Sequence, residues 1–183
     1  MASFISSPSP HPKAFQKAMV FIDGTNLFYR LRSAKLTVSS FKRLFHPSIL
    51  VAGRQITRLY LYTIEDHFEN AKKIHGDNFC DGIRVVYGIG VPTGDGNVRE
   101  KCVDALLVAD LIYHAASRNC EYAVVVTCDN DFAYALRRVE DFGCGTAVLS
   151  ICSDAPEHLR QSCDEYLFWD KDYLLANGAM VTT

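Results

Sequence analysis

The sequence predicts an α/β fold: a Rossmann-like, three-layer αβα domain with a mostly parallel central sheet of five or six strands. First, several apolar runs, such as EYAVVVTC, lack polar alternation, as expected for strands covered on both faces. Second, these runs alternate with helical segments, which favours right-handed βαβ crossovers and helices on both sides of the sheet. Third, 183 residues with a hydrophobic fraction of 49% suit one domain with a substantial core.

Six apolar runs are the expected strands. In chain order they are Met19–Asp23, Ile56–Ile64, Gly82–Ile89, Tyr122–Cys128, Gly145–Cys152 and, as a weaker sixth, Glu165–Trp169. Several of them end in a polar residue or a turn, and a helical segment follows. This order of elements is typical of βαβ units.

Three segments between these strands are the expected helices. The clearest is Glu100–Ser117, in which apolar residues recur at helical spacing: Val103, Leu107, Leu111 and Ala115. A second, Asp131–Asp141, ends before Gly143, a residue that favours helix C-termini. A weaker third helix is expected over His67–Phe79.

The remaining segments are expected to be loops and chain ends. Lys35–Arg54 is a long loop with a short helix inside it, and Gly90–Asn97 is either a solvated connector or a mobile flap over a site. We expect a disordered leader over residues 1–17, one domain over residues 18–176 and a flexible tail over residues 177–183. No internal repeat and no second domain is visible in the sequence.

Charge and cysteine content limit the classes of function. Lys and Arg number 19 and Asp and Glu 21, a formal net charge of -2, which argues against a broad basic surface that grips a long duplex. The leader has no signal-peptide pattern, and no apolar stretch is long enough for a membrane span. The seven cysteines are odd in number and include no C-x-x-C pair, so we expect reduced thiols and a cytoplasmic protein.

Four aspartates lie at predicted strand ends or helix starts. Asp23 ends the first strand, Asp104 lies in the first turn of a helix, and Asp129 and Asp131 follow the strand at Tyr122. In open α/β sheets, ligands bind at the carboxyl ends of strands, where the strand order reverses. If the strand that begins at Met19 and the strand that begins at Tyr122 are neighbours, their carboxyl ends lie roughly 5 Å apart. The sequence therefore predicts an acidic cluster at this edge.

Carboxylates that close would repel one another, and a divalent cation would remove the conflict. Oxygen ligands alone favour Mg²⁺ or Mn²⁺ over zinc. A capping role is an equal alternative for any single one of these aspartates, because helices begin just after them. Asp110 lies further along its helix and is interpreted as a structural or surface residue.

Three motifs, in this order, resemble the NYN family, a branch of the PIN-like nucleases. They are FIDGTN (Phe21–Asn26), EKCVD (Glu100–Asp104) and VVTCDNDF (Val125–Phe132). A helix followed by a glycine and a strand, in YALRRVEDFGCGTAVLS, also fits, and the resemblance covers Met19 to about Asp170. Two departures are Cys102 and Cys128, which stand where the family usually has glycine and could crowd the backbone beside the site.

The resemblance implies a PIN-like fold and Mg²⁺- or Mn²⁺-dependent hydrolysis of phosphodiester bonds, usually in RNA. It implies that Asp23, Asp104, Asp129 and Asp131 hold one or two metal ions. Asn26 would orient a phosphate or a metal-bound water, and Lys101 would offset charge on the phosphate. Thr127, where the family usually has serine, would lie behind the ligands and orient them. The products would carry 5′-phosphate and 3′-hydroxyl ends.

Basic and aromatic residues after the motifs suggest contacts with single-stranded or looped RNA. The expected RNA-binding residues are Arg30, Arg32, Arg137 and Arg138, with Lys35 nearby and the aromatics Phe28, Tyr29, Phe132 and Tyr134 interleaved. The alternative is that the aromatics belong to the core and the arginines to a solvated face. A homo-oligomer or a protein partner is compatible with this sequence as well.

Two other functions compete with an endonuclease that cleaves RNA. A non-catalytic PIN-like module would bind RNA or a protein, and the two cysteine departures leave it open. A haloacid-dehalogenase-like phosphatase is suggested by IDGT, but its nucleophilic aspartate would stand two residues before Asp23, where this chain has Phe21.

Overall fold

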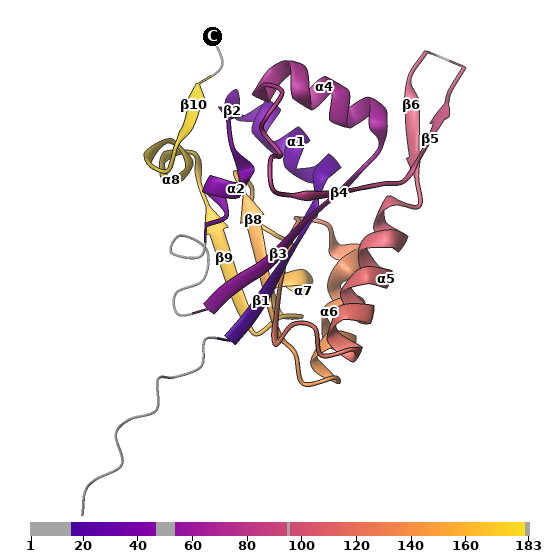
Figure 1. Ribbon diagram of the computed structural model, residues 1–183, viewed down its shortest axis with the longest axis vertical. Helices are drawn as coiled ribbons and strands as arrows, with labels where there is room; N and C mark the ends of the chain where they lie inside the picture. The colour runs from indigo at the N-terminus through magenta and orange to yellow at the C-terminus, as the bar shows by residue number, and fades with distance from the viewer. Residues whose placement is uncertain (1–15, 47–53, 95, 182–183) are drawn as a thin grey trace, which may run out of the picture.

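The computed structural model describes residues 16–46, 54–94 and 96–181. The predicted leader lies outside these ranges except for its last two residues, as does part of the predicted Lys35–Arg54 loop. The described chain forms three layers, with a six-stranded sheet between two groups of helices (Figure 1). The predicted αβα class is confirmed.

The central sheet is parallel throughout its described strands. Its strand order is β4-β3-β1-β7-β8-β9. The bounds are β1 (Gln16–Asp23), β3 (Arg54–Thr63), β4 (Arg84–Tyr87), β7 (Tyr122–Val126), β8 (Gly145–Ile151) and β9 (Glu165–Trp169). From β1 the chain builds one side of the sheet with β3 and β4, and then returns to build the other side from β7. The strand order therefore reverses between β1 and β7, which are direct neighbours.

Strand β1 contributes to both hydrophobic cores because its side chains alternate between the faces of the sheet. Ala18, Val20 and Ile22 belong to one buried cluster, and Met19 and Phe21 belong to the other. The first cluster includes residues of α1 (Gly24–Ser33), α2 (Phe41–Leu44), α4 (Glu65–His75) and α8 (Lys171–Ala176). The second includes residues of α5 (Val103–Ala116), α6 (Ala133–Glu140) and α7 (Glu157–Arg160). Helices therefore cover both faces, as the unbroken apolar strands require.

The segment expected to be a loop over Gly90–Asn97 belongs largely to a β-hairpin. Strand β5 (Ile89–Pro92) pairs antiparallel with β6 (Val98–Lys101), and the hairpin projects from the body of the molecule (Figure 1). The prediction that a helix begins at Glu100 is wrong, because β6 continues to Lys101 and α5 starts at Val103. Glycine and proline hide this short pair from a pattern search, since both are depleted in strands.

A second small sheet joins the C-terminal end of the described chain to the segment that follows α1. Strand β10 (Ala179–Val181) pairs antiparallel with β2 (Leu36–Val38). These residues lie within the 177–183 segment that the sequence suggested was a flexible tail. The pairing partner is far away in sequence, so a local pattern does not reveal it.

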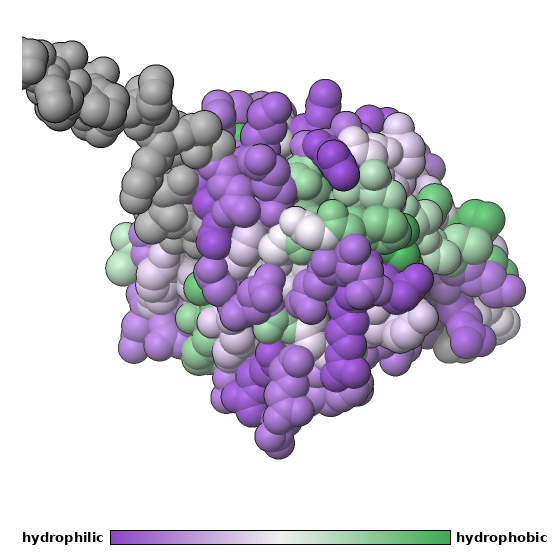
Figure 2. All heavy atoms as spheres, turned by 90° about the horizontal axis from the view of Figure 1, so that it is seen from below, coloured by the Kyte–Doolittle hydropathy of each residue, from purple (hydrophilic) through white to green (hydrophobic). Residues whose placement is uncertain are grey.

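The face of the molecule at the start of β1 lies opposite the carboxyl edge of the sheet. Figure 2 shows the molecule from below, on the side where β1 begins, and this face is mostly hydrophilic with one band of hydrophobic residues. None of the helices in the described residues has the length and apolar character needed to cross a bilayer. Asp23 ends β1 at the other edge of the sheet, where α1 begins.

Candidate functional site

An open cavity of about 250 Å³ lies at the carboxyl edge of the sheet, where the strand order reverses. We call it the acidic cavity, and its lining residues are Asp23, Thr25, Asn26, Tyr29, Glu100, Asp104 and Asp129. Four of these residues are carboxylates, and none is a lysine or arginine. The cavity therefore combines contributions from β1, α1, β6, α5 and the segment after β7.

Asp23 is the most buried carboxylate of the acidic cavity, with 6% of its surface exposed. It ends β1 and caps α1, because its Oδ1 accepts a hydrogen bond from the Asn26 N–H at 3.0 Å. The following Gly24 packs closely against β3, since a Cβ there would lie 2.6 Å from the Tyr62 carbonyl oxygen. Only glycine fits at this position without a backbone shift, so FIDGTN holds the aspartate at a fixed turn.

Thr127 links two of the predicted metal ligands. Its buried hydroxyl donates to Asp23 Oδ2 at 2.9 Å and accepts from the Asp129 N–H at 3.0 Å. Its own N–H donates to the Leu149 carbonyl at 3.1 Å, which ties this segment to β8. The ends of β1 and β7 are thus joined by one side chain, as the predicted position behind the ligands would require.

Asp129 is both a cap and a lining residue. Its Oδ1 accepts from the Asp131 N–H at 3.0 Å at the start of the short 3₁₀ helix η1 (Asn130–Phe132), and the residue also lines the acidic cavity. The two alternatives considered from the sequence are therefore compatible. Asp131 itself is exposed and does not line the cavity.

Glu100 and Asp104 enter from the hairpin and the helix after it. Asp104 lies in the first turn of α5, as predicted. Glu100 lies on β6, where its Oε2 accepts from the Thr25 hydroxyl at 2.6 Å and lies 3.7 Å from His67 Nδ1. One hydrogen bond therefore ties the hairpin to the first turn of α1.

The electrostatics of the cavity favour protonation of Asp23 and Asp104 when no cation is present. Burial is the main cause that raises the pKa of Asp23 from 3.8 to about 6, with smaller contributions from the charges of Asp104 and Glu100. Hydrogen bonds from Asn26 and Thr127 oppose this rise. Burial also raises the pKa of Asp104, and the charges of Glu100, Asp129 and Asp131 add to the effect. The cavity therefore has an excess of negative charge that a cation would relieve.

Several predicted site residues lie outside the acidic cavity. Lys101 is exposed on β6, and strand alternation puts it on the opposite face from Glu100. Arg32 lines a neighbouring pocket, while the Arg30 guanidinium lies 5.5 Å from the Tyr29 ring centroid. Arg137 is exposed on α6, where Arg138 pairs with Asp141 at 2.7 Å. The structure thus brings together Asp23, Asn26, Asp104 and Asp129 out of the predicted set.

Two lining residues, Thr25 and Glu100, were not singled out from the sequence as site residues. The cavity is also lined by Tyr29, one of the aromatics named above for contact with RNA. Glu100 and Thr25 lie within the quoted motifs, so a second carboxylate in EKCVD was a signal that could have been used. The contact between Thr25 and Glu100 spans 75 positions of sequence, which no local pattern shows.

A comparison with known proteins decides the family. The NYN domain profile matches residues 17–174, most of the chain. The chain belongs to the NYN family. This family is part of the PIN-like nuclease superfamily, whose members are generally nucleases, so the comparison supports a hydrolase at this coarse level.

Structural comparison supports the same fold. A crystal structure of a protein of unknown function from Vibrio parahaemolyticus is similar, with a TM-score of 0.69 and 16% sequence identity. The match covers 88% of this chain and 98% of that one. At this identity the likeness shows the fold alone. No curated protein matches this chain.

The two cysteines at the usual NYN glycine positions have different consequences. Cys102 adopts a left-handed conformation with φ 66°, so the backbone there favours the glycine that the family usually has. Cys128 directs its Sγ toward the Ser153 carbonyl at 3.3 Å and does not line the acidic cavity. The expected crowding of the site by Cys128 is therefore not seen in this geometry.

The phosphatase alternative has no nucleophile in this fold. Phe21 is fully buried and stacks on Tyr60, with ring centroids 5.6 Å apart. An aspartyl-phosphate mechanism needs a carboxylate at this position, next to the substrate. The buried aromatic ring instead belongs to the core under α5.

The donor set of the acidic cavity fits a hard divalent cation. Its oxygen-only ligands suit Mg²⁺ or Mn²⁺. Across residues 16–46, 54–94 and 96–181, no three His, Cys, Asp or Glu side chains form a ready-made metal-holding group. A cation in the acidic cavity would therefore take one or two carboxylates directly and complete its coordination with water, as Mg²⁺ usually does.

Proposed function

We propose that this NYN protein is a metal-dependent ribonuclease that hydrolyses RNA phosphodiester bonds at the acidic cavity. The observation that carries the proposal is the convergence of Asp23, Asp104 and Asp129 at the switch point of a PIN-like fold, with no basic side chain in the lining. Carboxylates gathered in this way are costly unless a cation binds between them. RNA is the substrate class that the family resemblance implies.

In this proposal one or two carboxylates of the set Asp23, Asp104 and Asp129 bind Mg²⁺ or Mn²⁺ directly, and the others hold waters of the cation. The bound cation would act as a Lewis acid on the phosphate and would lower the pKa of a water. Thr127 keeps the Asp23 carboxylate and the Asp129 backbone in register through its two hydrogen bonds. Asn26 lines the cavity and would orient a non-bridging phosphate oxygen.

Two of the predicted site residues, Asp131 and Lys101, do not line the acidic cavity and have supporting roles in the proposal. Asp131 lies outside the lining, but its charge still reaches Asp104, so it would hold waters around the cation. Lys101, on the outer face of β6, would contact the RNA backbone on either side of the reacting phosphate. The expected cleavage is endonucleolytic and leaves 5′-phosphate and 3′-hydroxyl ends.

A second candidate function is RNA binding without cleavage. The observation that favours it is that the described residues contain no ready-made group of three metal ligands. Binding of RNA in the presence of a chelator, with no cleavage on addition of Mn²⁺, would support this module. Cleavage of RNA on addition of Mn²⁺ therefore distinguishes the two functions.

The test is cleavage of a mixed RNA pool with Mn²⁺, followed by end mapping, for the wild type and Asp129→Asn. Asn keeps the cap at η1 but removes a charge, so we expect cleavage to fall about 100-fold or more.

Asp170→Asn is the matched control, because Asp170 also follows a parallel strand and caps a helix, accepting from the Tyr173 N–H at 2.7 Å. It does not line the acidic cavity, so this variant should cleave like the wild type. Equal activity of Asp129→Asn and the wild type would exclude Asp129 as a metal ligand.

A further inference from the structure

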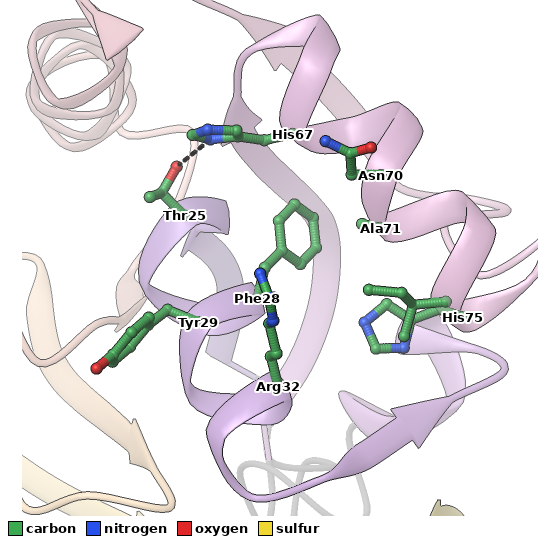
Figure 3. A pocket seen from close by; sticks show the side chains of 9 residues that line it. Thr25, Phe28, Tyr29, Arg32, His67, Asn70, Ala71 and His75 are labelled. Atoms are coloured by element: carbon green, nitrogen blue, oxygen red, sulfur yellow. Dashed lines mark hydrogen bonds between the residues drawn. The ribbon is translucent and has the colours of Figure 1, made fainter. Parts of the chain in front are cut away.

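A second pocket of about 260 Å³ lies between α1 and α4 (Figure 3). We call it the helix pocket, and the residues that matter below are Phe28 and Arg32 of α1 and Asn70, Ile74 and His75 of α4. Its lining contains no carboxylate, in contrast with the acidic cavity. Small-molecule pockets typically measure about 300–1,000 Å³, so this pocket lies just below that range and has room only for a small ligand.

The helix pocket lies beside the acidic cavity. Thr25 and Tyr29 line both of them. Thr25 donates to Glu100 on the acidic side, and its hydroxyl lies 3.3 Å from His67 Nδ1 on the other side. A chain that passes from one to the other crosses only the first turns of α1. A ligand of the helix pocket would therefore lie next to a phosphate in the acidic cavity.

The aromatic wall of the helix pocket is held rigidly. Figure 3 shows the Phe28 ring lying between the two helices. From behind, this ring packs against Phe41 and Phe79, at centroid distances of 6.3 and 6.1 Å. Tyr29 at the shared boundary is 63% exposed. Stacking on such rings is a sequence-tolerant way to bind an unpaired base.

The polar groups of the helix pocket are suited to a base edge and a phosphate. His75 Nδ1 accepts from the Val38 N–H at 3.2 Å, so the neutral ring carries its proton on Nε2. Burial lowers the pKa of His75 to about 4, which keeps the ring neutral. The Asn70 amide offers both a donor and an acceptor. Arg32 is exposed and brings a positive charge to the pocket.

We propose that the helix pocket binds one unpaired nucleotide of the RNA, the one adjacent to the phosphate in the acidic cavity. Its base stacks on Phe28, and Arg32 contacts its phosphate. The proposal deepens the ribonuclease function by assigning a separate pocket to one unpaired nucleotide of the substrate. It rests on that function only for the position of the nucleotide relative to the reacting phosphate.

The primary experiment measures binding of a fluorescent, mixed-sequence single-stranded RNA hexamer in EDTA, by anisotropy. Ile74→Trp fills the pocket from a side chain that is 45% exposed, so the fold should tolerate it. Loss of one stacked base should weaken binding at least about fivefold. Arg32→Ala, at an exposed position, should also weaken binding and lower the slope of log affinity against log salt by about 0.7.

Arg43→Ala is the matched control, because Arg43 is an exposed arginine of α2 that lines neither pocket. It should bind the hexamer like the wild type. Circular dichroism and thermal melting check that every variant is folded. If Ile74→Trp were misfolded, Arg32→Ala against Arg43→Ala decides the question alone.

Hexamers with a single abasic position sharpen the test. In the wild type, removal of one particular base should weaken binding at least about fivefold, and Ile74→Trp should abolish that penalty, because the base no longer enters the pocket. A penalty that is unchanged in Ile74→Trp would overturn the proposal. So would equal binding of the wild type and both pocket variants, or no binding of the hexamer by the wild type.

These outcomes separate the two proposals. Binding that depends on the helix pocket, without cleavage in Mn²⁺, supports the nucleotide site and contradicts the ribonuclease. Cleavage in Mn²⁺ with wild-type binding by both pocket variants supports the ribonuclease and contradicts the nucleotide site.

Discussion

The acidic cavity has two sides that are built differently. On the sheet side, Asp23 and Asp129 follow two buried parallel strands and are joined through Thr127. On the hairpin side, Glu100 comes from a two-stranded projection, and one hydrogen bond to Thr25 ties it to α1. The sheet side is fixed by the core, whereas every residue of β5 and β6 is half-buried or exposed, so the hairpin side is held by fewer buried contacts. We therefore expect the sheet side to determine catalysis and stability most strongly.

The largest difference between the sheet side and the hairpin side should come from the titration of Asp23 in the metal-free protein. Its pKa is raised from 3.8 to about 6, so the folded state binds this proton more tightly than the unfolded chain. The free energy of unfolding should therefore fall as the pH rises from about 4 to about 6, by up to about 3 kcal/mol from this group. Asp23→Asn lacks this titration.

The measurement is urea unfolding of the wild type and Asp23→Asn in EDTA at several pH values. The stability of the variant relative to the wild type should increase by up to about 3 kcal/mol between pH 4 and 7. Taking the difference removes other groups such as His75, whose lowered pKa acts in the opposite sense. If the difference in the free energy of unfolding between the two proteins does not change with pH, the pKa of Asp23 is not raised in the folded state.

The second effect concerns Thr127, whose hydroxyl joins the ends of β1 and β7. Thr127→Val keeps the shape but leaves the Asp129 N–H without its acceptor and frees Asp23, so stability should fall by about 1–3 kcal/mol. Cleavage should fall about 10- to 100-fold, measured as initial rates with Mn²⁺.

Thr146→Val is the control for this link. The Thr146 hydroxyl is also buried, donates to Glu140 Oε1 at 2.8 Å and accepts from the Asp164 N–H at 3.1 Å. This variant should lose similar stability and keep its cleavage rate, because the hydrogen-bond partners of the Thr146 hydroxyl, Glu140 and Asp164, do not line the acidic cavity. Equal loss of activity in both variants would mean that Thr127 acts only through folding.

A smaller effect is expected on the hairpin side. Glu100→Gln keeps an acceptor for the Thr25 hydroxyl but removes a charge from the cavity, so cleavage should fall only about tenfold. Glu69→Gln, at an exposed position on α4 that pairs with Lys72, serves as the control in the same Mn²⁺ assay. A loss with Glu100→Gln as large as that with Asp129→Asn would reverse the proposed ranking of the two sides.

The smallest effect is a gain in stability at the base of the hairpin. Cys102→Gly relieves the left-handed conformation at φ 66°, so the free energy of unfolding should rise by about 0.5–1 kcal/mol, a shift in melting temperature of a few degrees at most. Cys102→Ala removes the thiol but keeps the conformational cost, and should give no such gain. Equal melting of the glycine and alanine variants would contradict the strain at this position.

The difference between the two sides also explains what the sequence could predict. Asp23 and Asp129 were identified because each directly follows a buried apolar strand, a relation visible within a few residues. The hairpin was missed because Gly90, Pro92 and Gly94 resemble a loop, and its pairing was hidden by this composition. Lys101 falls within the predicted Glu100–Ser117 helix, but in the structure it is the last residue of β6.

By itself, the sequence determined the α/β class, the parallel sheet and the strand-end positions of Asp23 and Asp129. A strand that is buried on both faces has an unbroken apolar sequence, so it can be recognised without the structure. A residue that follows such a strand must lie at the carboxyl edge of the sheet.

Only the tertiary structure decided that Glu100 belongs to the acidic cavity while Asp131 does not, and that α1 and α4 enclose a pocket beside it. These features depend on contacts such as Thr25 with His67 and Thr127 with Asp23, which span 42 and 104 positions. Such contacts are set by the packing of whole elements, because no local pattern records which side chains meet when distant segments fold together.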